Sequence, residues 1–269
     1  MERSLAARVN LLRMYIQDLI RSVDMPEPRF SPISLKELGK TPREVALEMR
    51  VLWNIPRGPI QNLTKLMEDA GVLVLHWDFG TNKIDGLSIY EVDQAPPLIL
   101  LNRSMPGDRQ RFTLAHEFCH VLMHHNLQTL PPDDIEDEAN DFASEFLMPA
   151  ADIRAHLGAS PTLRTLANLK PHWRVSIGAL IERAASLNRI SEWQHRSLWM
   201  QMASNGWKLR EPIEISGETP RLFDELIQFH IRELGYTLPQ LCEGVLGIKA
   251  SEFQAQVFGG LHVIRSKGS

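Results

Sequence analysis

One stretch without Gly or Pro constrains the fold of this chain more than any other: Arg111 to His125, RFTLAHEFCHVLMHH. Its apolar residues recur on nearly every side, as expected of a central buried helix. In a helix, His116 and His120 stand four residues apart and therefore share one face. Glu117 follows the first of them, which completes a His-Glu-x-x-His pattern. Such a helix supplies half of a zinc site, with Glu117 as the base for a water held by the metal.

A catalytic zinc site uses three protein ligands, so the third must come from elsewhere in the chain. The next predicted helix, about Ile135 to Leu147, is rich in acidic residues. Glu136 and Asn140 lie four apart on one face of it, so Glu136 can bind metal while Asn140 contacts a ligand histidine. Glu138 lies about 200° round the helix from Glu136. We therefore predict Glu136 as the third ligand, with Glu138 as the alternative.

The His-Glu-x-x-His pattern is only moderately specific by itself. With 10 histidines in 269 residues, chance produces it in on the order of a few per cent of chains this size. Without a metal, the two histidines would be buried residues paired with backbone acceptors. The acidic helix at short range favours the metal site.

The patterns on either side of this stretch predict an α+β fold. Thr41-Pro42-Arg43-Glu44 has the form of a capped helix start, with Pro at the first helical position. Asp108 is the expected cap of the histidine helix. Three short apolar runs between these helices are predicted strands that form a small antiparallel or mixed sheet packed on the histidine helix: Val72 to Trp77, Ile84 to Val92, and Leu98 to Leu101.

The region after the acidic helix is predicted to be mostly helical. Thr162 to Leu187 resembles a helix-turn-helix, with Ser176 as an N-cap. Structural packing and a nucleic-acid or partner contact both stay open for this segment, because it contains these basic residues: Arg164, Lys170, Arg174 and Arg183. We expect an N-terminal helix and linker over 1–40, a main domain over 41–210 that includes helices at about 160–205, and a helical extension over 211–269.

Composition favours a cytoplasmic protein. Hydrophobic residues make up 43% and charged residues 23% of the chain, which is ordinary for a soluble globular protein. Two cysteines imply no disulfide framework, which fits a reducing compartment. Charged residues break each apolar run of the N-terminal helix, Leu5 to Val23, so we expect no signal peptide or membrane span. This helix suits packing or a homodimer contact. The net charge of −4 gives no argument for nucleic-acid binding.

Three motifs together resemble the ImmA/IrrE family of zinc metallopeptidases. They are Arg111 to His120, Glu136-x-x-Ala139-Asn140-x-Phe142-Ala143, and Phe146-Leu-Met-Pro149. The resemblance covers about Pro42 to Trp207. It implies a zincin-like fold in which His116, His120 and Glu136 bind metal and Glu117 is the catalytic base.

The resemblance also implies a function. Members cleave or control helix-turn-helix repressors and antitoxins in stress response, mobile-element and phage regulation, and many carry an upstream DNA-binding domain. This sequence shows no such domain, so direct nucleic-acid binding is not expected. We predict a zinc-dependent endopeptidase acting on such a protein partner, although manganese or another divalent ion suits the same ligands. A non-proteolytic binding module of the antitoxin type and a DNA-binding transcriptional regulator with a structural metal are the alternatives.

Several other residues have simpler interpretations. Cys119 is expected in the core rather than at the metal, because its side chain lies about 100° from His120. His124 and His125 are expected to cap or solvate the helix C-terminus, where a positive charge is favourable. Asn102 is interpreted as a turn residue, and a substrate contact is the less favoured alternative. The strand at Ile84 to Val92 is a candidate for edge pairing with an extended substrate.

Overall fold

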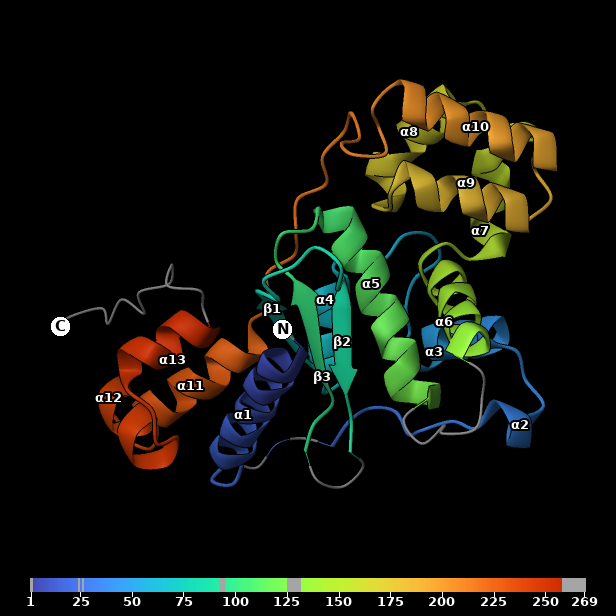
Figure 1. The fold of residues 1–269 in the computed structure, drawn as a ribbon. Coiled ribbons are helices and arrows are strands. Elements are labelled where there is room, and N and C mark those ends of the chain that lie inside the picture. The colour runs from blue at the N-terminus through green and yellow to red at the C-terminus, as the bar shows by residue number, and fades with distance from the viewer. Residues whose placement is uncertain (1, 24, 26, 92–94, 125–131, 258–269) are drawn as a thin grey trace. The chain divides into compact units, whose positions relative to one another are not determined.

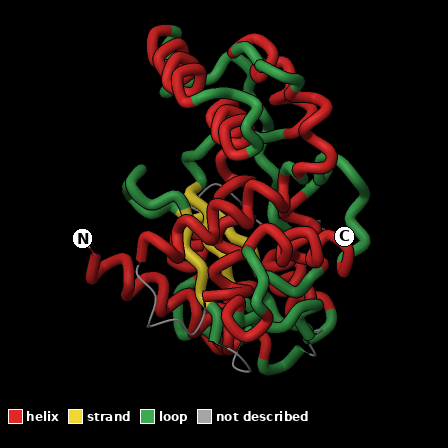
Figure 2. The backbone as a smooth tube through the Cα atoms, turned by 90° about the vertical axis from the view of Figure 1, so that its right-hand side faces the viewer, coloured by secondary structure: helices red, strands yellow, loops and turns green. Residues whose placement is uncertain are grey.

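A computed structural model describes residues 2–23, 25, 27–91, 95–124 and 132–257. Within these ranges helices predominate and three strands form one sheet (Figure 2). This is the predicted α+β class with a small mixed sheet. The chain divides into two compact units, each assembled from separate stretches. We call Met1–Arg29, Met67–Ser104 and Pro220–Ser269 the sheet unit, and Phe30–Leu66 and Met105–Thr219 the helical unit.

The sheet has the strand order β1-β3-β2. β1 (Leu73–Trp77) runs parallel to β3 (Leu98–Asn102), and β2 (Gly86–Ile89) runs antiparallel to it. β1 and β3 are almost completely buried, which explains why both read as continuous apolar runs. β2 is half-buried and lies at an edge of this sheet. The substrate pairing expected there stays a prediction.

Helices complete the sheet unit. α11 (Leu222–Arg232) packs on β1 and contacts α1 (Glu2–Ile20), as Figure 1 shows. Leu12 and Ile16 of α1 are buried in the same core cluster as Phe223 of α11. α1 therefore has the packing role expected from its apolar spacing. The unit continues with α12 (Leu238–Gln240), the π-helix η2 (Leu241–Val245) and α13 (Ala250–Val257).

The helical unit begins with α2 (Leu35–Leu38) and α3 (Pro42–Leu52). The predicted capping box is present at α3, where Thr41 and Glu44 exchange side-chain and backbone hydrogen bonds. α4 (Leu63–Asp69) contains the boundary between the two units, which falls between Leu66 and Met67. The remaining elements are α5 (Gly107–Cys119), the π-helix η1 (His120–His124), α6 (Pro132–Leu147), α7 (Ala150–Leu157), α8 (Leu163–Trp173), α9 (Ile177–Ser186) and α10 (Glu192–Ser204).

α6 packs against both α3 and α5, and α8, α9 and α10 pack in succession (Figure 1). Small residues on α6, Ala139 and Ala143, are fully buried and let α5 approach closely. Phe118 of α5 and Phe142 of α6 meet at 6.0 Å between ring centroids. This packing brings the histidine helix and the acidic helix side by side.

Two local predictions were wrong. Asp108 does not cap α5: Pro106 occupies the N-cap position, and no side chain caps the helix there. Asp108 is instead buried and paired with a lysine. The helix also does not continue to His125 as one α-helix, because it changes to π-helical hydrogen bonding at His120. His125 itself lies outside the described residues.

Among the described helices, none combines the length and hydropathy that crossing a bilayer requires. The domain limits expected near residues 40 and 210 stay a prediction.

Candidate metal centre

His116, His120 and Glu136 meet at one point of the helical unit, as the sequence predicted. The two Nε2 atoms of His116 and His120 lie 3.0 Å apart. Glu136 places Oε2 3.1 Å from the His116 Nε2 and Oε1 3.7 Å from the His120 Nε2. One ligand atom from each residue lies within 4.8 Å of the others. The structure therefore brings together the three residues that the spacing singled out.

These distances fit a divalent cation bound between the three side chains. Ligands about 2.0–2.1 Å from a tetrahedral zinc stand about 3.3 Å from one another, and the observed separations lie on both sides of that value. Two imidazoles and a carboxylate form a donor set that zinc commonly has in hydrolases. Three protein ligands also leave the fourth position of a tetrahedral ion to water or substrate.

Burial keeps His120 suited to metal binding. Desolvation, followed by the neighbouring His116 and His124, lowers the pKa of His120 to about 3. The imidazole is therefore neutral at pH 7, and a neutral imidazole is the form that binds metal. His116 and His120 remain partly accessible, whereas Glu136 is exposed on α6. The ligand atoms thus lie at the surface of this unit rather than deep within it.

Asn140 contacts a ligand histidine from the position that helical phase predicted. Its Oδ1 lies 3.1 Å from His116 Nδ1. When Nδ1–H donates to this oxygen, the lone pair of His116 lies on Nε2, the atom that faces His120 and Glu136. The predicted positioning contact is therefore present in the structure.

Glu138, the alternative ligand, points to a different partner. Its Oε2 lies 2.9 Å from His124 Nε2. His124 Nδ1 in turn lies 2.9 Å from His120 Nδ1. The expectation that His124 caps or solvates a helix end was wrong, since its side chain is only 4% exposed. The π-helical turn that starts at His120 keeps His124 on the side of the acidic helix. The extended His-x-x-x-His-x-x-x-His spacing was the sequence signal for this contact.

Glu117 and Cys119 lie on α5 beside the ligands. Glu117 is 9% exposed and directly follows His116 in the chain. Cys119 is fully buried, and burial raises the pKa of its thiol well above the usual value, with the charges of Glu138 and Glu136 adding to the effect. It is a core residue, as predicted.

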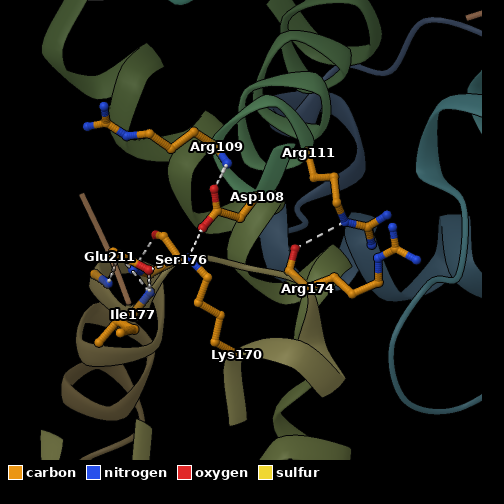
Figure 3. Close-up of polar contacts among 10 residues, drawn as sticks. Asp108, Arg109, Arg111, Lys170, Arg174, Ser176, Ile177 and Glu211 are labelled. Atoms are coloured by element: carbon orange, nitrogen blue, oxygen red, sulfur yellow. Dashed lines mark hydrogen bonds and ion pairs between the residues drawn. The ribbon is translucent and has the colours of Figure 1, made fainter. Parts of the chain in front are cut away.

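Ion pairs with little solvent exposure hold the first turn of α5, and the sequence analysis did not predict them (Figure 3). The Lys170 ammonium on α8 lies 2.5 Å from Asp108 Oδ2 and 2.6 Å from Glu211 Oε2. Glu211 also accepts a 3.0 Å hydrogen bond from the backbone N–H of Ile177 at the start of α9. These contacts join α5, α8 and α9 through a single buried cation.

A second buried pair lies one turn further along α5. Arg111 donates to the carboxylate of Glu218, and its Nε donates to the backbone carbonyl of Arg174 at 3.2 Å, as Figure 3 shows for the latter contact. Thr64 N–H donates to the other oxygen of Glu218 at 2.8 Å. A Cβ added at Gly107 would lie 2.5 Å from the carbonyl oxygen of Ile215. Residues 215–218 therefore pack closely on the start of α5, although residues 205–219 form no helix or strand.

The helix-turn-helix-like segment uses much of its positive charge internally. Lys170 is 2% exposed, and Arg183 is fully buried and paired with Glu145 on α6 and with the carbonyl of Met148. Arg164 is exposed. Structural packing thus accounts for the two buried cations. Asn102, in the sheet unit, is the buried last residue of β3 and donates to the carbonyls of Thr81 and Ile84, so its prediction as a turn residue was wrong.

Comparison with known proteins agrees with this site. A helical segment that joins two histidines, an adjacent glutamate and a third acidic ligand defines a metallopeptidase-type domain. Residues 67–185 match the family described as the IrrE N-terminal-like domain, Peptidase_M78. This segment resembles the ImmA/IrrE family and includes His116, Glu117, His120, Glu136 and Asn140. No curated protein matches the chain.

Proposed function

We propose that this chain is a zinc-dependent endopeptidase that cleaves a protein partner. One observation carries the proposal: His116, His120 and Glu136 converge within 4.8 Å on the helix face next to Glu117. Zinc at these ligands supplies Lewis acidity, which makes a water more acidic and polarises a peptide carbonyl. A binding module without catalysis has no need of the glutamate that follows His116.

The side chains divide the work. His116, His120 and Glu136 would hold the metal, and Asn140 would orient the His116 ring through its contact with Nδ1. The Glu117 carboxylate accepts a proton from the attacking water and delivers it to the leaving amine. Burial of Glu117 limits the competition of bulk water for that proton.

We propose a helix-turn-helix repressor or antitoxin as the partner, in stress response or in mobile-element and phage regulation. Support for this comes from the family resemblance of the motifs and from the match of residues 67–185. The chemistry of the site itself requires only a peptide bond that can reach the metal.

The test combines metal analysis with a charge-neutral variant of the base. Wild type and Glu117→Gln are purified, their zinc and manganese contents are measured, and each is co-expressed with candidate repressors. We expect both proteins to bind metal and only wild type to cleave. Asp137→Asn, an exposed acidic residue on α6, serves as a control that keeps cleavage.

Two results contradict the proposal. Metal-free wild type would remove its basis. Bound metal with identical partner behaviour of wild type and Glu117→Gln would instead support the non-proteolytic binding module.

A further inference from the structure

The His120 ring is the start of a chain of partly buried hydrogen bonds that leads away from the candidate metal ligands. Its Nδ1 lies 2.9 Å from His124 Nδ1, and His124 Nε2 lies 2.9 Å from Glu138 Oε2. The His124 side chain is 4% exposed and that of Glu138 is 29% exposed. No part of the proposed peptide hydrolysis uses these two residues directly.

Only one arrangement of protons satisfies this chain when His120 binds metal. A ligating Nε2 has no hydrogen, so Nδ1 of His120 carries the proton and donates it. His124 Nδ1 must then accept, which leaves the hydrogen of His124 on Nε2. That hydrogen points to the carboxylate of Glu138, which is an acceptor only. Each contact in the chain therefore has one donor and one acceptor.

The same chain determines where the His120 ring points. An imidazole held by Nδ1 cannot rotate about χ2 without breaking a buried hydrogen bond, so its Nε2 stays directed at the His116 and Glu136 atoms. A carboxylate at the far end also makes the ligand nitrogen a better electron donor, through the intervening imidazole. The two ligand histidines differ in this respect, because His116 is held by a neutral amide, Asn140.

We infer that His124 and Glu138 are positioning residues of the metal centre, which hold the His120 imidazole in the tautomer and orientation that bind the ion. The inference rests on the metal site of the proposed function and deepens it. The competing account is a purely structural tie between η1 and α6. That account predicts lower stability of the metal-free protein with no change in the metal affinity of the folded protein.

The experiment measures zinc affinity of the full-length, metal-free chain by competition with a chromophoric chelator. His124→Leu removes the acceptor of His120, and Glu138→Gln keeps the shape but removes the charge. We expect zinc binding about 10–100-fold weaker in His124→Leu and about 10-fold weaker in Glu138→Gln. Long-range nitrogen NMR of the zinc-bound proteins reports the His120 tautomer, which we expect as Nδ1–H in wild type.

Two further variants separate positioning from general effects. Asp137→Asn removes one charge from the same helix at an exposed position, so we expect its zinc affinity within twofold of wild type. His124→Gln can accept from His120 and donate to Glu138 through one amide, so we expect it to regain most of the affinity lost in His124→Leu. Circular dichroism confirms that each variant is folded, and Glu138→Gln tests the inference if His124→Leu does not fold.

The outcomes distinguish this inference from the proposed function. If wild type binds zinc and both Glu138→Gln and His124→Leu bind it with the affinity of wild type, the positioning role is wrong. The peptidase proposal would then remain intact. Equal losses of zinc affinity in Asp137→Asn and Glu138→Gln would also overturn the positioning role, because the loss of one negative charge on α6 would then explain both. A wild type that binds no divalent metal would overturn both proposals.

Discussion

Replacement of Lys170 by methionine should destabilise the helical unit by about 3–5 kcal/mol, because it leaves the buried Asp108 and the partly buried Glu211 without their cation. The ammonium lies 2.5 Å from Asp108 Oδ2 and 2.6 Å from Glu211 Oε2, so these two oxygens are at most about 5 Å apart. Two unit charges at that separation repel by about 3 kcal/mol at an effective dielectric constant of about 20. Glu211 keeps its backbone donor at Ile177, which favours the lower end of the range.

Urea unfolding followed by circular dichroism measures this loss as a shift of the transition midpoint. Arg164→Met is the matched control, because it removes an exposed cation from the same helix and should change stability by less than about 0.5 kcal/mol. The double variant Lys170→Met with Asp108→Asn removes one of the two opposing charges. We expect it to recover more than half of the stability lost in Lys170→Met.

Two results would refute this reasoning. One is a loss below about 1 kcal/mol in Lys170→Met, which is the size expected for an exposed ion pair. The other is a double variant no more stable than Lys170→Met, which would show that repulsion between the carboxylates is not the cause of the loss.

Three further measurements test other parts of the structure. Gly107→Ala places a methyl group 2.5 Å from the Ile215 carbonyl oxygen and should lower the free energy of unfolding in urea by about 1–3 kcal/mol. The control Gly244→Ala has no atom within 4 Å of the added Cβ and should leave that free energy unchanged. Equal unfolding midpoints of the two variants would contradict the close packing at Gly107. Glu136→Ala should leave the melting temperature of the metal-free protein unchanged but abolish the zinc-dependent stabilisation, about 2.7 kcal/mol at zinc 100 times the Kd; a retained zinc response would exclude this ligand. Burial raises the pKa of Cys242 to about 11. Alkylation of this thiol in the folded protein at pH 8, followed by mass spectrometry, should therefore be at least about 100-fold slower than in urea and should accelerate as the pH rises towards 11. Equal alkylation rates in the folded protein and in urea would argue against burial.

The predicted ligand set depended on short-range geometry, which the sequence expresses well. Two histidines four apart share a helix face whatever surrounds the helix. Glu136 and Asn140 repeat that spacing on the next helix, so helical phase alone distinguishes Glu136 from Glu138. The capping box of α3 also depends on short-range geometry, because Thr41 and Glu44 are only three residues apart. Residues such as these need only their own turn of helix to be placed correctly.

The missed contacts depend on distance along the chain or on a change of helix type. Lys170 is 62 residues from Asp108 and 41 from Glu211, and a pairing at that range leaves no periodicity in the sequence. Asp108 was read as a helix cap because acidic residues favour that place, but a distant lysine uses its carboxylate instead. His124 was misplaced because a positive charge is favourable at a helix C-terminus, although its spacing of four from His120 already indicated the same helix face.

The contact of residues 215–218 with the start of α5 has a consequence for how the protein is made. Glu218 is synthesised 107 residues after Arg111, the residue it pairs with. At about 5–20 residues per second, a ribosome takes about 5–20 s to cover that distance. During this interval α5 has been synthesised, but Arg111 still lacks the carboxylate of Glu218. The helical unit therefore completes its folding late in translation. In a nascent chain that stops before Glu211, Lys170 lacks Glu211 and Arg111 lacks Glu218.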